Sequence, residues 1–202
     1  MKILHIIPSL VKGGAERITL DIYQELLKYQ DHEVRMVYFR KVNDYEYITN
    51  ELNVEKINLS YQLSLKSKSK GNIAELQRIV DEFQPDVIHS HLFESEIMLS
   101  QLKDFKGKHF VHFHDNMRQF KKWNGKFKKK HLTEWYERKK VLSSYNKKRV
   151  EFIGISKDTL AYIHKNMPHH YKSHFLLNAI NLERFREPKG SHRKMLKAVM
   201  IG

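Results

Sequence analysis

Short apolar runs and amphipathic segments alternate along the first half of the chain. The apolar runs are typical of strands buried on both faces of a sheet, and they lie at 2–7, 33–39 and 53–58. From Ile18 to Leu26, apolar side chains recur every four positions, which predicts an amphipathic helix over 14–28. A similar helix is predicted from residue 73 until just before Pro85.

The second half of the chain repeats this alternation. Further strands are predicted at 86–89, 109–114, 150–155 and 174–177. Further helices are predicted at 94–103, 126–145 and 157–165, the last with Ser156 as its N-cap. Two less regular stretches predict a short helix within 41–52 and a polar loop over 61–72. Together this spacing predicts an α/β fold, a Rossmann-like parallel sheet with helices on both faces.

Candidate binding residues lie at the predicted strand ends, where open parallel sheets bind their ligands. Gly13 and Gly14 follow the first strand, and adjacent glycines let a ligand approach the backbone closely. The helix that starts there offers free N–H groups that suit a phosphate. The spacing is neither GxGxxG nor a Walker A loop, so it disfavours dinucleotide-binding and P-loop sites. A plain strand-to-helix turn explains the two glycines equally well.

Histidines mark the ends of two later strands. His89 and His91 end one strand, and His112 and His114 end the next, with Asp115 directly after. Together they could supply three zinc ligands, but no HExxH-type helix or carboxylate partner accompanies them, so we expect no metal. They could instead be capped by backbone, bind a sugar or phosphate, or move a proton near neutral pH. An imidazole next to a carboxylate, as at His114, could orient a hydroxyl group.

Composition narrows the class of protein. The 202 residues include no cysteine, which excludes disulfide scaffolds, Cys-ligated metal sites and thiol catalysis, and suits a reducing cytoplasm. No stretch approaches the roughly 20 apolar residues of a membrane span. The apolar run before Pro8 is too short for the core of a signal peptide. A net charge of +14 indicates an anionic partner: nucleic acid, an acidic membrane surface or a phosphorylated small molecule.

Most of this charge lies in one segment. Residues 118–149 hold thirteen Lys and Arg residues against two Glu, and therefore eleven of the fourteen net positive charges. Both tryptophans lie there as well. Interfacial helices combine basic and aromatic residues, so we expect an anionic membrane surface to contact Lys121, Lys122, Trp123, Phe127, Lys128, Lys129 and Lys130. The alternatives are a merely solvated basic helix and, less favoured, single-stranded nucleic acid; we expect no nucleic acid.

Five motifs, taken in order, resemble glycosyltransferase family 4 of the GT-B superfamily. They are GGAER (13–17), PDVIHSH (85–91), FHDN (113–116), FIGISKDT (152–159) and LLNAINLERF (176–185). Each is weak alone, but their order across about 180 residues is specific. The last departs from the family's usual proline–Asn-Gly-Ile-Asp pattern, because Leu177 replaces the proline, Ala179 the glycine and Asn181 the aspartate.

The resemblance implies two Rossmann-like domains facing across a cleft, the first holding the acceptor and the second a nucleotide-sugar donor. We expect 1–188 to be the acceptor domain, and 189–202 to be a linker and the first strand of a donor domain that is otherwise missing. The implied reaction is a retaining transfer to a saccharide or lipid-linked acceptor, without cofactor or obligatory metal. The alternative is a non-catalytic binding module that has lost its donor half.

The resemblance also implies site residues. His114 would lie beside the transferring sugar and act in catalysis, and the glycine loop would approach the donor diphosphate. The expected substrate-binding residues are Gly13, Gly14, Arg17, His91, Asp115 and Asn178. The expected location is the cytoplasm, peripheral on the inner face of the plasma membrane.

Overall fold

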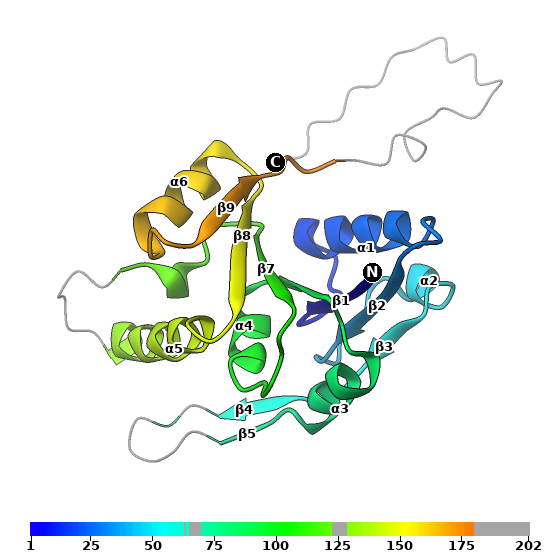
Figure 1. Ribbon diagram of the computed structural model, residues 1–202, viewed down its shortest axis with the longest axis horizontal. Coiled ribbons are helices and arrows are strands. Elements are labelled where there is room, and N and C mark those ends of the chain that lie inside the picture. Colours follow the sequence, from blue (N-terminus) through cyan, green and yellow to red (C-terminus); the bar gives the residue numbers. More distant parts are fainter. Residues whose placement is uncertain (63, 65–69, 123–128, 180–202) are drawn as a thin grey trace, which may run out of the picture.

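Seven parallel strands form the central sheet, with the order β3-β2-β1-β6-β7-β8-β9 (Figure 1). The computed structural model describes residues 1–62, 64, 70–122 and 129–179. The sheet strands are β1 (Lys2–Ile7), β2 (Glu33–Tyr38), β3 (Val54–Lys56), β6 (Val87–His91), β7 (Lys108–Phe113), β8 (Arg149–Gly154) and β9 (Lys172–Phe175). The predicted Rossmann-like α/β fold is therefore confirmed.

Six α-helices and one 3-10 helix occur in the described part of the chain. They are α1 (Gly14–Leu26), α2 (Glu46–Thr49), α3 (Ala74–Phe83), α4 (Phe93–Leu99), η1 (Arg118–Phe120), α5 (Lys129–Tyr145) and α6 (Lys157–Asn166). None of these helices has the length and apolar character needed to cross a membrane.

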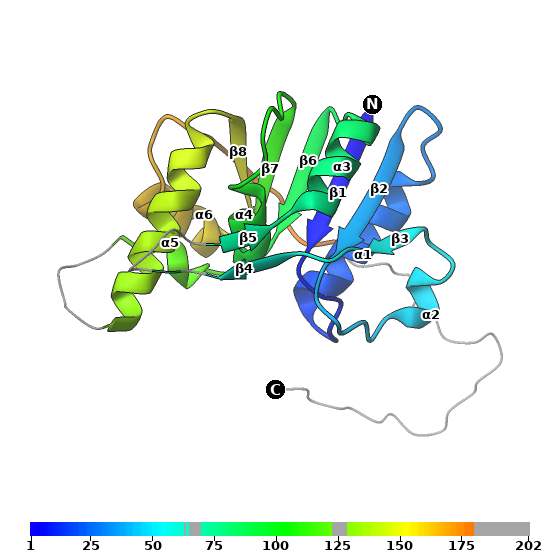
Figure 2. The same cartoon turned by 90° about the horizontal axis from the view of Figure 1, so that it is seen from below.

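Apolar side chains on the two faces of the sheet pack against different helices. On one face, Leu4 and Ile6 of β1 pack with Leu76 and Ile79 of α3 in a cluster that also includes α4. On the other face, Ile3 and Ile7 pack with Leu20 and Tyr23 of α1. Figure 2 shows α3, α4 and α5 in front of the sheet and α1 behind it. Successive side chains of a strand point to opposite faces, so the apolar side chains of β1 on either side of His5 pack into both layers.

The strand order reverses between β1 and β6. Helix α1 leads from β1 outward to β2, whereas α4 leads from β6 to β7 on the other side. Ligands in such sheets bind beyond the carboxyl ends at this reversal. These ends lie along the lower edge of the sheet in Figure 2, and the loops after β1, β6 and β7 meet there.

Some predicted bounds were wrong. The predicted polar loop over 61–72 holds part of an antiparallel hairpin, β4 (Ser60–Gln62) and β5 (Lys70–Asn72). Helix α4 was predicted to reach residue 103 but ends at Leu99, where the hydroxyl of Ser100 donates to the carbonyl of Ile97 and draws the chain into a turn. The end of the last motif (180–185) and the expected linker and first donor-domain strand within 189–202 lie outside the described residues.

Candidate functional site

The glycine loop lies at the N-terminus of α1. Gly13 is its N-cap, with extended backbone, and its carbonyl accepts a hydrogen bond from the Tyr45 hydroxyl at 3.3 Å. The carboxylate of Glu16 folds back over Gly13, into the space that a side chain at position 13 would need. A side chain at Gly14 would meet no atom of the described chain within 4 Å. The loop is therefore open at Gly14, and at Gly13 an anion would have to displace Glu16.

The two charged side chains next to the glycine loop, Glu16 and Arg17, are both engaged within α1. Arg17 contacts Asp21 one helical turn on, at 2.6 Å, so its guanidinium is already neutralised along α1. Burial raises the pKa of Glu16, although a bond from its own backbone N–H opposes this. A carboxylate at a helix N-terminus is favoured by the helix dipole. Glu16 thus occupies the Gly13 side of this helix N-terminus, and the Gly14 side stays open for the phosphate that the sequence predicted.

His114 is part-exposed at the end of β7, but its ring nitrogens are turned inward. Its Nε2 lies 2.9 Å from Nδ1 of His91, and its Nδ1 is buried without a partner among the described residues. His91 is fully buried, and its Nε2 lies 3.4 Å from Nδ1 of His5. His91 was predicted to bind substrate directly, and the structure places it behind His114. It could therefore act on a ligand only through the His114 ring.

Five histidines form one cluster on the α1 side of the sheet, namely His5, His89, His91, His112 and His114. They share a face because His5 pairs with His89 in register, and His91 with His112. Burial lowers the pKa of His5 and of His114 to about 4 each. Burial, together with the neighbouring imidazoles, also holds the pKa of His89 and His91 well below the ordinary value. The cluster is therefore uncharged near neutral pH.

A polar hollow of about 350 Å³ lies beyond the carboxyl ends of the strands. Asp115 lines it from the loop after β7 and Arg118 from η1, and Arg40 lines it from the loop after β2 and Glu94 from the first turn of α4. The Arg40 guanidinium makes two parallel bonds of 2.7 Å to the Glu94 carboxylate. A neighbouring hollow of about 470 Å³ shares the same ion pair. This paired geometry offers both donors and acceptors to a polyhydroxylated ligand.

The remaining predicted residues lie apart from the hollow. Asn178 is exposed, three residues beyond the carboxyl end of β9 at the edge of the sheet. Lys121 and Lys122 are exposed beside η1, and the backbone N–H of Lys122 donates to Asn166 of α6. Trp123, Phe127 and Lys128 lie outside the described residues, as do the side chains of Lys129 and Lys130.

Three residues of this edge were missed by the sequence reasoning. Arg40 and Glu94 each follow a predicted strand by one or a few residues, so the strand-end rule that selected Asp115 also applies to them. His5 gave no such signal, because it stands inside an apolar run. Only the pairing of β1 with β6 brings His5 next to His91, 86 positions away.

The sequence of the chain matches a family of known proteins. A family model described as Glycosyltransferase Family 4 matches residues 12–184. A search of curated proteins finds no match. Among solved structures, the UDP-GlcNAc 2-epimerase from Neisseria meningitidis bound to UDP-GlcNAc is 10% identical with a TM-score of 0.46, over 88% of this chain and 46% of that one. MurG from Acinetobacter baumannii is 9% identical with a TM-score of 0.37, over 91% and 69%.

The chain spans about half the length of the first solved structures that it matches. The family match covers most of the chain, from the glycine loop to the last described strand and slightly beyond it. It also includes all five motifs that carry the resemblance, apart from Phe185 at the end of the last one. The chain belongs to glycosyltransferase family 4.

Proposed function

We propose that this chain binds the acceptor in the transfer of a sugar from a nucleotide-sugar to a saccharide or lipid-linked acceptor, with retention of anomeric configuration. The observation that carries the proposal is the hollow of about 350 Å³ at the carboxyl edge of a family 4 domain. Its polar lining suits hydroxyl groups, and its place beyond the strand ends is where such sheets bind ligands.

Each site residue has a role in this proposal. Asp115 and the Arg40–Glu94 pair hydrogen-bond the acceptor. His114 directly precedes Asp115, outside the lining of the hollow, and in this proposal it lies beside the transferring sugar. The open backbone at Gly14 faces the donor diphosphate, whose departure is stabilised by N–H groups and cations rather than by a metal. Such preorganised donors stabilise charge as it develops in the transition state.

A titration of the ¹⁵N-labelled chain, followed by NMR, tests ligand binding. The probes are UDP- and GDP-sugars, oligosaccharides and a polyprenyl phosphate. We expect shifted amide signals at Asp115–Gln119, Arg40 and Glu94. Arg118→Ala should weaken the effect, whereas Arg78→Ala should not, because Arg78 pairs with Glu82 on α3, outside this hollow. Unshifted amides at this edge with every probe would refute the proposal.

A transfer assay on an intact enzyme, in which this chain is joined to a donor domain, tests the role of His114. Radiolabelled UDP- and GDP-sugars are supplied with the same acceptors, and product is separated by chromatography. We expect His114→Ala to reduce transfer by about tenfold or more while circular dichroism stays unchanged. His164→Ala serves as the matched control, because His164 is an exposed histidine bonded to Ser173. Equal transfer by His114→Ala and the wild-type chain contradicts the role.

A membrane surface is the second partner that we propose, for a lipid-linked acceptor at the inner face of the plasma membrane. Exposed Lys121 and Lys122 stand beside α5, on which Leu132 and Trp135 are 39% and 38% exposed. Lys139 lies over the Trp135 ring at 5.3 Å, so an aromatic and a cation face solvent together. Each basic residue near an acidic bilayer contributes about 1 kcal/mol.

Flotation with phosphatidylcholine vesicles, with and without phosphatidylglycerol, tests this partner. We expect binding only to the anionic vesicles. Replacing both Lys121 and Lys122 with Glu should weaken it by at least about tenfold, from the energy per residue given above. The same change at exposed Lys157 and Lys165 of α6 is the control. Binding to an oligonucleotide without any lipid dependence would favour nucleic acid instead.

A further inference from the structure

The histidine cluster does not satisfy its own hydrogen bonds. Its rings form three nitrogen–nitrogen pairs, and buried nitrogens of His5, His112 and His114 have no partner among the described residues. These partnerless atoms, Nε2 of His5, Nε2 of His112 and Nδ1 of His114, lie on the outside of the cluster, whereas Nδ1 of His5 and Nε2 of His91 face each other inside it. Apolar side chains would fill this core at less cost, yet five imidazoles converge here from three strands.

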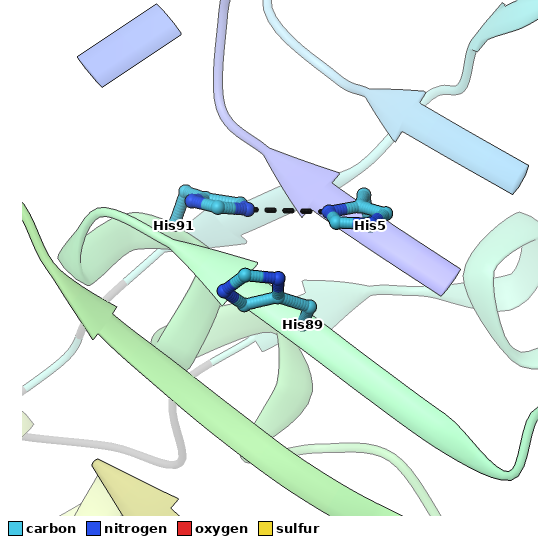
Figure 3. A group of neighbouring side chains, drawn as sticks. All are labelled: His5, His89 and His91. Atoms are coloured by element: carbon cyan, nitrogen blue, oxygen red, sulfur yellow. Dashed lines mark hydrogen bonds between the residues drawn. The ribbon is translucent and has the colours of Figure 1, made fainter. Parts of the chain in front are cut away.

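We propose that His5, His89 and His91 bind one divalent transition-metal ion, with Zn²⁺ the expected metal. Candidate ligand atoms of these three residues all lie within 4.8 Å of one another. Nδ1 of His5 and Nε2 of His91 are 3.4 Å apart, and two nitrogens about 2.0–2.1 Å from a tetrahedral Zn²⁺ are separated by about 3.3 Å. Figure 3 shows the His89 ring beside the line joining these two atoms.

Two further histidines are hydrogen-bonding partners of the proposed ligands. Nδ1 of His91 is 2.9 Å from Nε2 of His114, and Nε2 of His89 is 3.1 Å from Nδ1 of His112. A ligand histidine usually donates its second N–H to such a partner, which fixes its tautomer. With metal on Nε2 of His91, the proton is on Nδ1 and is donated to His114. The proton of His114 is then held on its own Nδ1.

A second grouping, His91, His112 and His114, fits a metal less well. Its closest nitrogens, on His91 and His114, are 2.9 Å apart, a hydrogen-bond distance that is too short for two ligands of a tetrahedral ion.

A hollow reaches one of the three proposed ligands. His89 lines a hollow of about 440 Å³ on the α1 side of the sheet, next to Ile3 and Phe110. Three histidines and an open fourth position form the ligand set of catalytic rather than structural zinc sites.

Metal titration of the purified chain tests the site. The chain is treated with EDTA, desalted and titrated with ZnCl₂ in competition with a chromophoric chelator. We expect one tightly bound equivalent, and Co²⁺ in its place should give the visible absorption of a four-coordinate ion. NMR of ¹⁵N-labelled histidine rings should show metal-induced shifts at His5, His89 and His91, with the His114 proton on Nδ1.

Substitutions separate this site from adventitious binding. His91→Gln and His89→Gln should weaken Zn²⁺ binding at least a hundredfold, and His112→Gln about 10- to 100-fold, as for other outer partners. The control replaces exposed His169 and His170 together and should leave binding unchanged. If the His91→Gln variant does not fold, Zn²⁺ binding by the His89→Gln variant tests the site, because His89 is part-exposed. Failure of the wild-type chain to bind one equivalent, or undiminished binding in the cluster variants, overturns the proposal; neither result bears on sugar transfer.

Discussion

Tyr145→Phe is a direct test of the buried polar network between the sheet and α5. The Tyr145 hydroxyl donates to the Glu96 carboxylate at 2.6 Å, and both side chains are at most 1% exposed. Burial raises the pKa of Glu96, but attraction to His109 and hydrogen bonds from His109, Ser90 and Tyr145 outweigh it and leave that pKa below its ordinary value. Glu96 is therefore an anion at neutral pH that depends on its few donors.

The magnitude follows from the burial. A hydrogen bond to a charged group contributes about 1.5–3 kcal/mol, and water cannot replace the lost hydroxyl at a site without solvent access. We expect the free energy of unfolding to fall by about 2–3 kcal/mol. For a chain of this length, each kcal/mol lowers the Tm by about 2–4 °C, so the Tm should fall by about 4–12 °C.

Urea denaturation followed by circular dichroism measures this change, with the m-value checked for constancy. Tyr171→Phe is the matched control, because the Tyr171 hydroxyl makes a bond of 3.1 Å to exposed Asn146, and it should cost less than about 0.5 kcal/mol. In a Glu96→Gln background, Tyr145→Phe should cost at least about 1 kcal/mol less. A loss below about 0.5 kcal/mol in the original background would refute the reasoning.

Three further predictions concern stability. Burial lowers the pKa of Lys148 to about 8. Because the unfolded chain then binds more protons than the folded chain between pH 8 and 10, the free energy of unfolding should rise over this range by up to about 3 kcal/mol. Urea denaturation of the Lys148→Met variant at the same pH values should not show this rise. Ser156→Ala removes a capping box in which the Ser156 hydroxyl accepts from the N–H of Thr159, and should cost about 1 kcal/mol by the same method; an unchanged midpoint contradicts this. Gly107→Ala would place a Cβ 2.5 Å from the Asp86 carbonyl oxygen, so calorimetry should show a loss of about 1–3 kcal/mol, and a wild-type Tm would disprove the clash.

Much of the candidate site could be predicted from strand ends alone. His89, His91, His112 and His114 all stand where apolar runs stop, and the structure brings them together at one edge. The expectation of no metal rested on local motifs, since no carboxylate accompanies these residues in the chain. That reasoning did not include His5, because its neighbours in the sequence are apolar. The histidines that His5 contacts are 84 or more positions away in the chain. Such a partner has no local signal.

The sequence by itself determined the layers of this protein, because burial on one or both faces leaves a period that can be read over a few residues. Runs such as 2–7 predicted strands, and the four-residue spacing from Ile18 predicted α1. The tertiary structure decided which side chains meet. Parallel pairing sets His5 opposite His89, and a slip of one residue would turn one of them to the opposite face. Register is a property of two strands together, and neither strand carries it alone.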